Sequence, residues 1–360
     1  MNWLVVEKNT VAEARHTAGV KARDDAEKIL LDAGCKELVI EISDDRDNAG
    51  KLDKLLVHFK LLKEWNKTFS PVQKGDVVFI QFPVVNHTLV LDRAIKKLVA
   101  NGVKVVALIH DLEVLRLSLS DNFSKAQKWR LKREEVSVMN LFSEIIVHNE
   151  SMLEYMNQVL GISKEKMVNL EIFDYLIDNP ENKKIERTAD NYKSVIIAGN
   201  LSQMKAAYAY DLPEETQFVL YGPNYEGKKD GNITYKGSFP PDDLPFVLEG
   251  GFGLVWDGIS SKTCEGVWGE YLKYNNPHKT SLYLASQLPL VIWEKAALAD
   301  FVVKNGCGIT VASLFDIPEA INKVTEEEYK KMLENTKAVS EKLVSGYYLM
   351  KATGSEKECN

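Results

Sequence analysis

The stretch VVFIQFPVVNHTLVLDRAIKKLVANGVKVVALI, residues 77–109, decides the fold. Its two ends, Val77–Gln81 and Val103–Ile109, are short and nearly continuous apolar runs, which is typical of strands buried on both faces. Between them, Leu89–Asn101 repeats its apolar residues with the period of a helix. A strand, a helix and a second strand of this kind predict a βαβ unit in a parallel sheet.

The same alternation continues on both sides of this unit and predicts an α/β domain over residues 1–177. Further strands are expected at Trp3–Val6, Glu37–Ile42, Glu144–His148 and Met167–Ile172. Further helices are expected at Val20–Ala33, Lys51–Trp65 and Leu131–Phe142. Residues 178–192, DNPENKKIERTADNY, are polar and lack periodicity, so they predict a linker at the domain boundary.

A second strand–helix series follows the linker and predicts a second Rossmann-like domain over residues 193–335. Its strands are expected at Ser194–Ala198, Gln217–Tyr221, Ile233–Lys236, Phe252–Val255, Leu290–Trp293 and Cys307–Val311. A C-terminal helix over 336–353 is expected to pack back toward the first domain, and 354–360 reads as a tail. Doubly wound sheets bind ligands at the carboxyl ends of their strands, so we expect a site in the cleft between the two domains.

Bulk composition excludes several classes of protein. A net charge of −7 argues against a sequence-independent nucleic-acid binder. Residues 1–6 resemble a first strand rather than a signal sequence, and no apolar run reaches the roughly 20 residues of a membrane span, so a cytoplasmic protein is expected. The four cysteines are scattered and no D-x-D follows a strand, so no metal site is expected.

The segment YNNPHKTSLYLAS, residues 274–286, predicts a helix with an anion site at its start. Asn276 is a good N-cap residue, and Pro277 suits the first helical position. The residues that follow are His278, Lys279, Thr280 and Ser281. Free N–H groups, the helix dipole, the Lys279 charge and two hydroxyl groups would together bind a phosphate. The alternative is a well-capped helix with Lys279 in solvent.

Candidate bases stand at the ends of the predicted N-terminal strands. His110 and Asp111 end one buried strand, where a carboxylate could accept a proton from a hydroxyl group or cap the next helix. Glu7, after the first strand, is a second candidate base, or a surface-loop residue. His16, Gln81 and His87 are candidates for acceptor binding, and His16 and His87 also read as ordinary loop or cap residues.

Several segments resemble a bacterial family of GT-B sugar transferases that contains galactofuranosyltransferases and a glucosyltransferase of serine-rich adhesins. The order and spacing of the matching segments cover nearly the whole chain. They are HTAGVKA (16–22), FIQFP (79–83), LIHD (108–111), IAGNL (197–201), GGFGLVW (250–256) and residues 274–286. The resemblance implies two Rossmann-like domains facing a cleft, with the donor nucleotide in the C-terminal one and the acceptor in the N-terminal one.

The resemblance also implies roles for single residues. Lys279 would contact the UDP phosphates, Asn200 and Tyr221 would lie near the nucleotide, and Thr17 would reach across the cleft. The adhesin-type enzyme has an arginine shortly after the Gly-Asn turn, where this chain reads Ser-Gln-Met-Lys, so Lys205 would replace it.

The expected activity is transfer of a hexosyl group, galactofuranose or glucose, from a UDP-sugar to a saccharide acceptor. The acceptor would be lipid-linked or protein-linked, in surface polysaccharide or glycoprotein assembly, and UDP-sugar would be a substrate with no further cofactor. The basic segment 124–133 is either a solvated helix face or a peripheral membrane contact. Relatives of this type often self-associate. The alternatives are a two-lobed sugar- or nucleotide-binding protein and a UDP-sugar epimerase.

Overall fold

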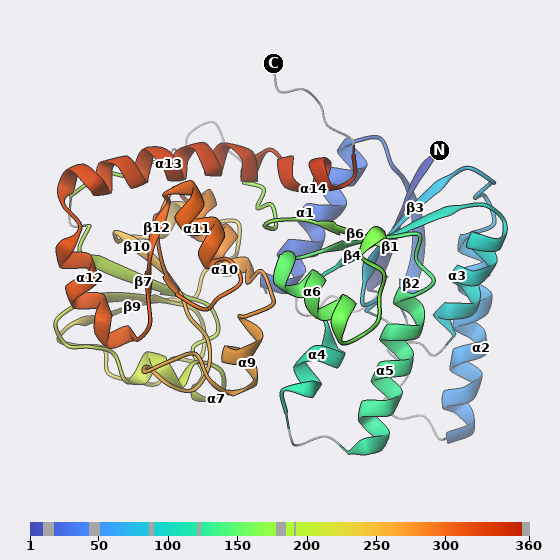
Figure 1. The fold of residues 1–360 in the computed structure, drawn as a ribbon, viewed down its shortest axis with the longest axis horizontal. Coiled ribbons are helices and arrows are strands. Elements are labelled where there is room, and N and C mark those ends of the chain that lie inside the picture. Colours follow the sequence, from blue (N-terminus) through green and yellow to red (C-terminus); the bar gives the residue numbers. More distant parts are fainter. Residues whose placement is uncertain are drawn as a thin grey trace.

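The computed structural model describes residues 1–9, 18–42, 51–85, 90–120, 124–177, 185–190 and 192–354. They form two lobes, each built on a six-stranded sheet flanked by helices (Figure 1). Every strand pairing in both sheets is parallel. This α/β architecture of two facing doubly wound sheets confirms the predicted fold class.

The N-lobe sheet has the strand order β2-β1-β3-β4-β5-β6. Its strands are β1 Asn2–Asn9, β2 Lys36–Ile42, β3 Val77–Phe82, β4 Lys104–Ile109, β5 Glu144–Val147 and β6 Met167–Asn169. Its helices are α1 Ala18–Asp32, α2 Lys51–Thr68, α3 Leu91–Ala100, α4 Glu113–Ser118, α5 Lys125–Met139 and α6 Glu150–Gln158. Five of the six residues in β3 and in β4 are buried, as the apolar runs of the βαβ unit predict.

The C-lobe sheet has the order β12-β11-β10-β7-β8-β9. Its strands are β7 Ser194–Ala198, β8 Gln217–Tyr221, β9 Ile233–Gly237, β10 Phe252–Val255, β11 Leu290–Trp293 and β12 Gly308–Val311. Its helices are α7 Gln203–Ala206, α8 Leu244–Val247, α9 Gly266–Tyr271, α10 His278–Ala285, α11 Ala299–Asn305, α12 Ile317–Lys323 and α13 Glu326–Val344.

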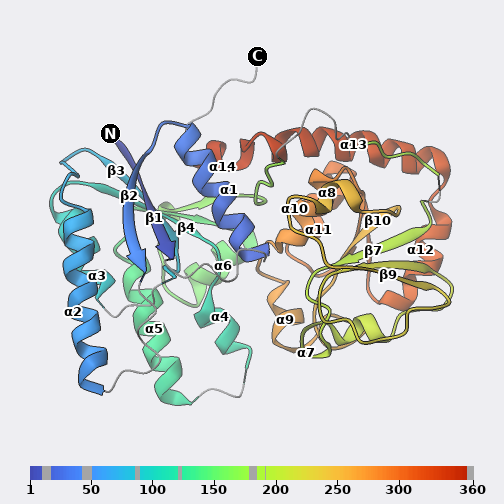
Figure 2. The ribbon, with the colours of Figure 1, turned by 180° about the vertical axis from the view of Figure 1, so that it is seen from behind.

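The chain returns to the N-lobe at its C-terminal end. Helix α13 runs along the C-lobe, and α14, Tyr347–Ala352, lies against α1 (Figures 1 and 2). The buried Asp174 carboxylate accepts hydrogen bonds from the backbone N–H groups of Tyr348 (3.1 Å) and Leu349 (2.8 Å). A carboxylate at these free N–H groups anchors α14 beside the segment that leaves β6.

Some predicted element bounds are wrong. Strand β1 continues to Asn9, so Glu7 lies inside it rather than after it. The C-terminal helix expected over 336–353 is divided between the end of α13 and α14, and the short helices α4, α6 and α9 were not predicted. Helices of one or two turns are marginal by themselves and form through tertiary packing, so their local pattern is weak.

The linker is attached to the C-lobe through Arg187, a residue whose polar surroundings gave no sign of burial. Its guanidinium donates to the backbone oxygens of Ser286 (3.0 Å), Leu248 (2.5 Å) and Pro245 (3.2 Å). One side chain therefore joins the ends of α8 and α10 to the segment between the lobes.

The turns after β7 and β8 approach each other closely. A Cβ atom at Gly222, whose φ is +140°, would lie 1.7 Å from the backbone oxygen of Gly199. Only glycine fits this approach, because any side chain would collide with fixed backbone. The packed glycines hold the turn that carries Asn200 at the carboxyl edge of the sheet.

Within the described residues, no helix is both long and apolar enough to cross a membrane.

Candidate functional site

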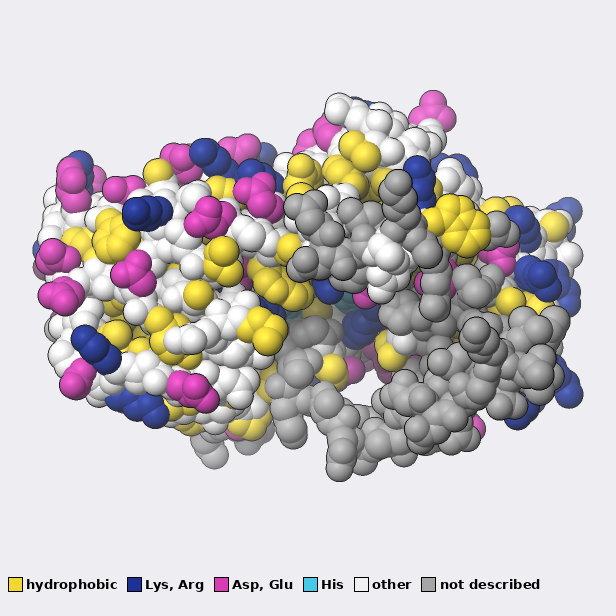
Figure 3. Space-filling model, turned by 90° about the horizontal axis from the view of Figure 1, so that it is seen from below, with side chains coloured by type: hydrophobic (Ala, Val, Ile, Leu, Met, Phe, Trp, Pro, Cys, Tyr) yellow, Lys and Arg dark blue, Asp and Glu magenta, His cyan; other side chains and the backbone are white. Residues whose placement is uncertain are grey.

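The carboxyl ends of strands from both sheets meet between the lobes. Seen from below, the molecule is hollowed there, and Lys and Arg side chains lie in the hollow (Figure 3). Asp111 follows β4 of the N-lobe and Asp257 follows β10 of the C-lobe, so each sheet contributes one carboxylate from the end of a central strand. We call this hollow the cleft.

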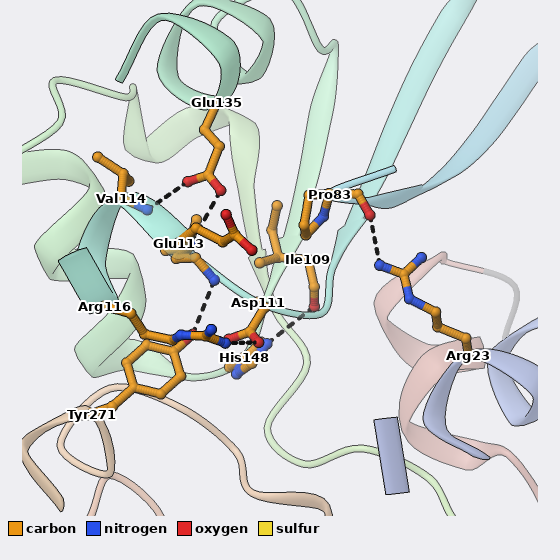
Figure 4. A network of polar contacts seen from close by, with 11 residues as sticks. Arg23, Pro83, Ile109, Asp111, Glu113, Val114, Arg116, Glu135, His148 and Tyr271 are labelled. Atoms are coloured by element: carbon orange, nitrogen blue, oxygen red, sulfur yellow. Dashed lines mark hydrogen bonds and ion pairs between the residues drawn. The ribbon is translucent and has the colours of Figure 1, made fainter. Parts of the chain in front are cut away.

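Asp111 is held by donors from both lobes. Its Oδ1 accepts a hydrogen bond of 2.6 Å from the hydroxyl of Tyr271, which ends α9 of the C-lobe. Its Oδ2 forms an ion pair of 2.5 Å with Nη1 of Arg116 on α4 (Figure 4). The side chain keeps 38% exposure. The carboxylate is thus oriented by both lobes and remains open to solvent.

Lysine and arginine side chains gather on the other side of this carboxylate. Lys205 on α7 and Arg116 both lie over the Trp268 ring, at 5.1 Å and 4.8 Å from its centroid. Lys279 Nζ contacts Asp257 Oδ1 at 3.0 Å and the backbone oxygen of Trp256 at 2.8 Å. The structure therefore brings Lys205, Lys279 and Asp111, three of the sequence candidates, into one electrostatic cluster.

Lys205 is the cation in this cluster that lacks a counter-ion. No carboxylate of the described residues lies within ion-pair distance of it, whereas Lys279 pairs with Asp257 and Arg116 with Asp111. Burial lowers the pKa of Lys205; the more distant charges of Asp257 and Asp111 oppose this shift, while those of Lys279 and Arg116 add to it. A half-buried ammonium without an anion is costly, and a bound anion would remove that cost.

The start of α10 differs from the predicted capped helix. The N-cap position is taken by Pro277, not Asn276. Thr280 is completely buried and its hydroxyl finds no partner among the described residues, while the Ser281 hydroxyl donates to the backbone oxygen of Phe173 at 2.6 Å. Neither hydroxyl points into the cleft, so the anion site of α10 reduces to Lys279 and the N–H groups of its first turn.

His278, the first residue of α10, packs beneath the cleft. Its ring stacks on Tyr175 with a centroid separation of 5.0 Å. Burial lowers the pKa of His278 to about 4, so the ring is neutral at physiological pH. The His278 ring therefore fills space beneath the cleft and adds no positive charge to it.

Asn276 joins the two lobes instead of capping a helix. Its Oδ1 accepts from Asn149 Nδ2 at 2.7 Å, and its Nδ2 donates to the backbone oxygens of His148 (2.5 Å) and Glu171 (3.1 Å). The residue is only 4% exposed. All three partners belong to the N-lobe side, so this amide fixes the start of α10 against the ends of β5 and β6.

Asn276→Ala is expected to destabilise the protein by roughly 3 kcal/mol, because it removes three hydrogen bonds between the lobes from buried or partly buried groups. Urea unfolding followed by circular dichroism measures this change. The matched control is Asn140→Ala, since Asn140 is exposed and, among the described residues, its amide donates to the Val136 oxygen of its own helix. Equal effects of the two substitutions would contradict the bridging role of Asn276.

The other two candidate bases are each engaged by a neighbouring group. His110 Nε2 contacts Gln81 Oε1 at 2.7 Å, and the ring stacks on Phe173. Burial holds the pKa of His110 well below its usual value, with smaller contributions from Arg23, His148 and His278. Glu7 accepts a hydrogen bond of 3.0 Å from the Val85 N–H.

Of the two residues expected near the nucleotide, one lies at the cleft. Asn200 is exposed in the turn after β7, and its Oδ1 accepts from Ser202 N–H and Asn224 Nδ2, both at 3.1 Å. The Tyr221 hydroxyl instead donates to the Val247 oxygen and accepts from the Glu249 N–H. The pleat of β8 turns the Tyr221 side chain toward the sheet face that α8 covers, so both of these hydrogen bonds lie at the C-terminal end of α8.

Three sequence candidates, His16, Thr17 and His87, lie outside the residues that the structure describes. Two residues of the cluster were missed, Asp257 and Arg116. The strand-end rule that selected Asp111 applies equally to Asp257. Arg116 lies on a helix that the sequence did not predict. Among the described residues, no three His, Cys, Asp or Glu side chains gather as a metal ion would require.

Family models match both lobes of the chain. Residues 5–172 match the N-terminal domain and residues 195–355 the C-terminal domain described as glucosyltransferase 3-like. The β-1,6-galactofuranosyltransferase WbbI of Escherichia coli strain K12 is 35% identical over 356 residues, covering 94% of each chain. Glucosyltransferase 3 of Streptococcus gordonii is 25% identical and covers 92% of this chain and 91% of its own.

A solved structure resembles the fold along its whole length. Sucrose-phosphate synthase from Thermosynechococcus elongatus superimposes with a TM-score of 0.60, at 12% identity, over 98% of both chains. At this identity the likeness concerns the fold, which is GT-B.

Proposed function

This chain belongs to the glucosyltransferase 3-like family, and from that premise we propose that it transfers galactofuranose from UDP-galactofuranose to a saccharide acceptor. The chain is a UDP-sugar glycosyltransferase of GT-B fold. The choice of galactofuranose over glucose is supported by the higher identity to a galactofuranosyltransferase, 35% against 25%.

The diphosphate of the donor binds between Lys205 and Lys279 in this proposal. The observation that carries it is the partly buried Lys205 ammonium beside the ion pair of Lys279 and Asp257, since no described carboxylate forms an ion pair with Lys205. A diphosphate would supply the missing anion and would accept from the N–H groups that open α10. These donors would then stabilise the negative charge that develops on the leaving UDP.

Asp111 is the general base of the same proposal. It lies on the N-lobe side of the cleft and keeps an exposed face, with both carboxylate oxygens oriented by hydrogen-bond donors. The carboxylate would take the proton of the acceptor hydroxyl as that oxygen bonds the anomeric carbon and the bond from this carbon to the UDP oxygen breaks. Gln81, His16 and His87 would contact the acceptor in this proposal.

The reaction is tested by incubating the protein with each UDP-sugar and a panel of saccharides, followed by mass spectrometry. UDP-galactofuranose, UDP-galactopyranose and UDP-glucose form the donor series. An acceptor enlarged by one hexose only with UDP-galactofuranose supports the proposal. Free UDP without an enlarged acceptor contradicts it, and interconversion of the UDP-sugars without an acceptor favours an epimerase.

A lipid-linked acceptor would place the protein at the cytoplasmic membrane surface. Helix α5 carries five lysines and arginines between residues 125 and 133, and Trp129 on it is 65% exposed. A basic helix with an exposed aromatic ring suits the interface of an anionic bilayer.

We expect co-sedimentation with vesicles containing phosphatidylglycerol and not with phosphatidylcholine alone. Trp129→Ser should weaken it several-fold, while replacement of the exposed Phe315 by serine on the C-lobe should not. Equal binding to both vesicles would contradict the membrane contact. Light scattering of the protein without vesicles measures self-association, which the resemblance to this family also implies.

A further inference from the structure

Tyr271 belongs to the C-lobe by sequence but packs in the core of the N-lobe. It is the last residue of α9, is 3% exposed and lies in the cluster of buried side chains that fills the N-lobe. Helix α9 contacts α4, the helix that follows Asp111. Docking of the lobes thus carries this side chain across the boundary.

The Tyr271 hydroxyl makes two hydrogen bonds where it arrives. It donates to Asp111 Oδ1 at 2.6 Å and accepts from the Leu112 N–H at 3.0 Å. Burial raises the pKa of Tyr271 well above its usual value, and the Asp111 charge raises it further, so the phenol stays protonated and remains a donor. The hydroxyl is fixed by the backbone while it fixes the carboxylate, as Figure 4 shows.

The ring and the hydroxyl have separable purposes. The ring alone accounts for the burial, since a phenylalanine would fill the same space. The hydroxyl adds a bond to a carboxylate that is 38% exposed and already paired through its other oxygen with Arg116. An ion pair through one oxygen leaves a carboxylate able to rotate about its own bond, whereas a second donor on the other oxygen stops that rotation.

We propose that Tyr271 is a positioning residue of the transfer reaction, through which the donor-binding lobe orients the base of the acceptor-binding lobe. The proposal rests on Asp111 as the base of the proposed function. Its consequence is that Asp111 is aligned only while α9 is docked against α4. Donor-lobe docking and acceptor activation are thereby coupled through one hydroxyl group.

Other titratable groups lie around Asp111, and Tyr271→Phe alters none of them directly. They are Arg116 on α4, Arg23 on α1, Glu135 on α5, Lys205 on α7 and His148 after β5. Tyr271→Phe therefore tests the loss of one uncharged hydrogen-bond donor, separately from any change in the charges around Asp111.

The test is Tyr271→Phe, assayed for transfer over a range of pH and for UDP binding by calorimetry. We expect kcat to fall by about 10- to 100-fold, the value of one hydrogen bond to a charged group. The donor KM and the UDP Kd should stay within about twofold. The acidic limb of the kcat profile should move to higher pH, because the carboxylate loses a bond that favours its charged form.

Tyr274→Phe is the matched control. Tyr274 lies three residues further on and packs edge-on against Tyr155, and its hydroxyl bonds no donor or acceptor among the described residues. Its kcat should equal that of the unmodified protein. In an Asp111→Asn background, Tyr271→Phe should cause almost no further loss, because there is no base left to position.

An unchanged kcat and pH profile in Tyr271→Phe would overturn the inference. So would a fall in kcat with an unmoved pH profile and an equal further loss in the Asp111→Asn background, since that pattern describes a structural role. If Asp111→Asn itself keeps full activity, the base assignment of the proposed function fails, which is a separate result.

Discussion

Lys279→Ala is expected to weaken UDP binding by about 100-fold and to lower kcat by about 10²–10³. The loss of affinity is the usual cost of removing one partner from a partly buried, charge-assisted contact. The loss of kcat is that expected when one donor to a developing negative charge is removed. Lys279 stands at the start of α10, where its charge adds to the free N–H groups of the helix. Calorimetry with UDP and steady-state assays measure the two effects.

The ion pair with Asp257 requires its own control, because Lys279→Ala leaves that carboxylate without its partner and repelling a phosphate. The double variant Lys279→Ala with Asp257→Asn removes the repulsion. We expect it to recover only a small part of the affinity. Lys304→Ala, an exposed residue of α11, makes the same change of net charge and should bind UDP normally.

Lys205→Ala separates the two cations of the proposed diphosphate site. Because Lys205 has no carboxylate partner among the described residues, its loss exposes no new charge, and a weaker UDP affinity would report the contact directly. Normal UDP affinity in both Lys279→Ala and Lys205→Ala would refute the site.

Asp111→Asn is expected to lower kcat by about 10²–10⁴ while leaving the UDP Kd unchanged. The amide is nearly the same size and still accepts from the Tyr271 hydroxyl, but it cannot take the acceptor proton. Loss of transfer with retained donor binding is the signature of a missing base. The measurement pairs a transfer assay at saturating donor with calorimetry.

The variants Glu7→Gln and His110→Gln decide between Asp111 and the other two candidate bases. Both should retain most of the transfer activity, since Glu7 is engaged by a backbone N–H and burial depresses the pKa of His110 far below neutrality. A larger loss in either variant than in Asp111→Asn would transfer the role of base to that residue.

Local pattern was enough to predict the two sheets. A strand buried on both faces is a short continuous apolar run, and apolar residues recur every third or fourth position in a helix. Residues 77–109 therefore predict a βαβ unit without reference to the rest of the chain. The same locality placed Asp111, His110 and Asn200 at strand ends, and Lys279 at a helix start.

The partners of these residues were decided by the tertiary structure alone. Asn276 looks like a helix cap in sequence and is an interlobe bridge, and Ser281 looks like a phosphate ligand and bonds the Phe173 backbone. Tyr271 meets Asp111 across 160 residues of chain. A buried polar group forms hydrogen bonds with the groups that are buried beside it. Which groups are buried together here depends on how the two lobes dock, and the local hydrophobic pattern of the sequence holds no information about that docking.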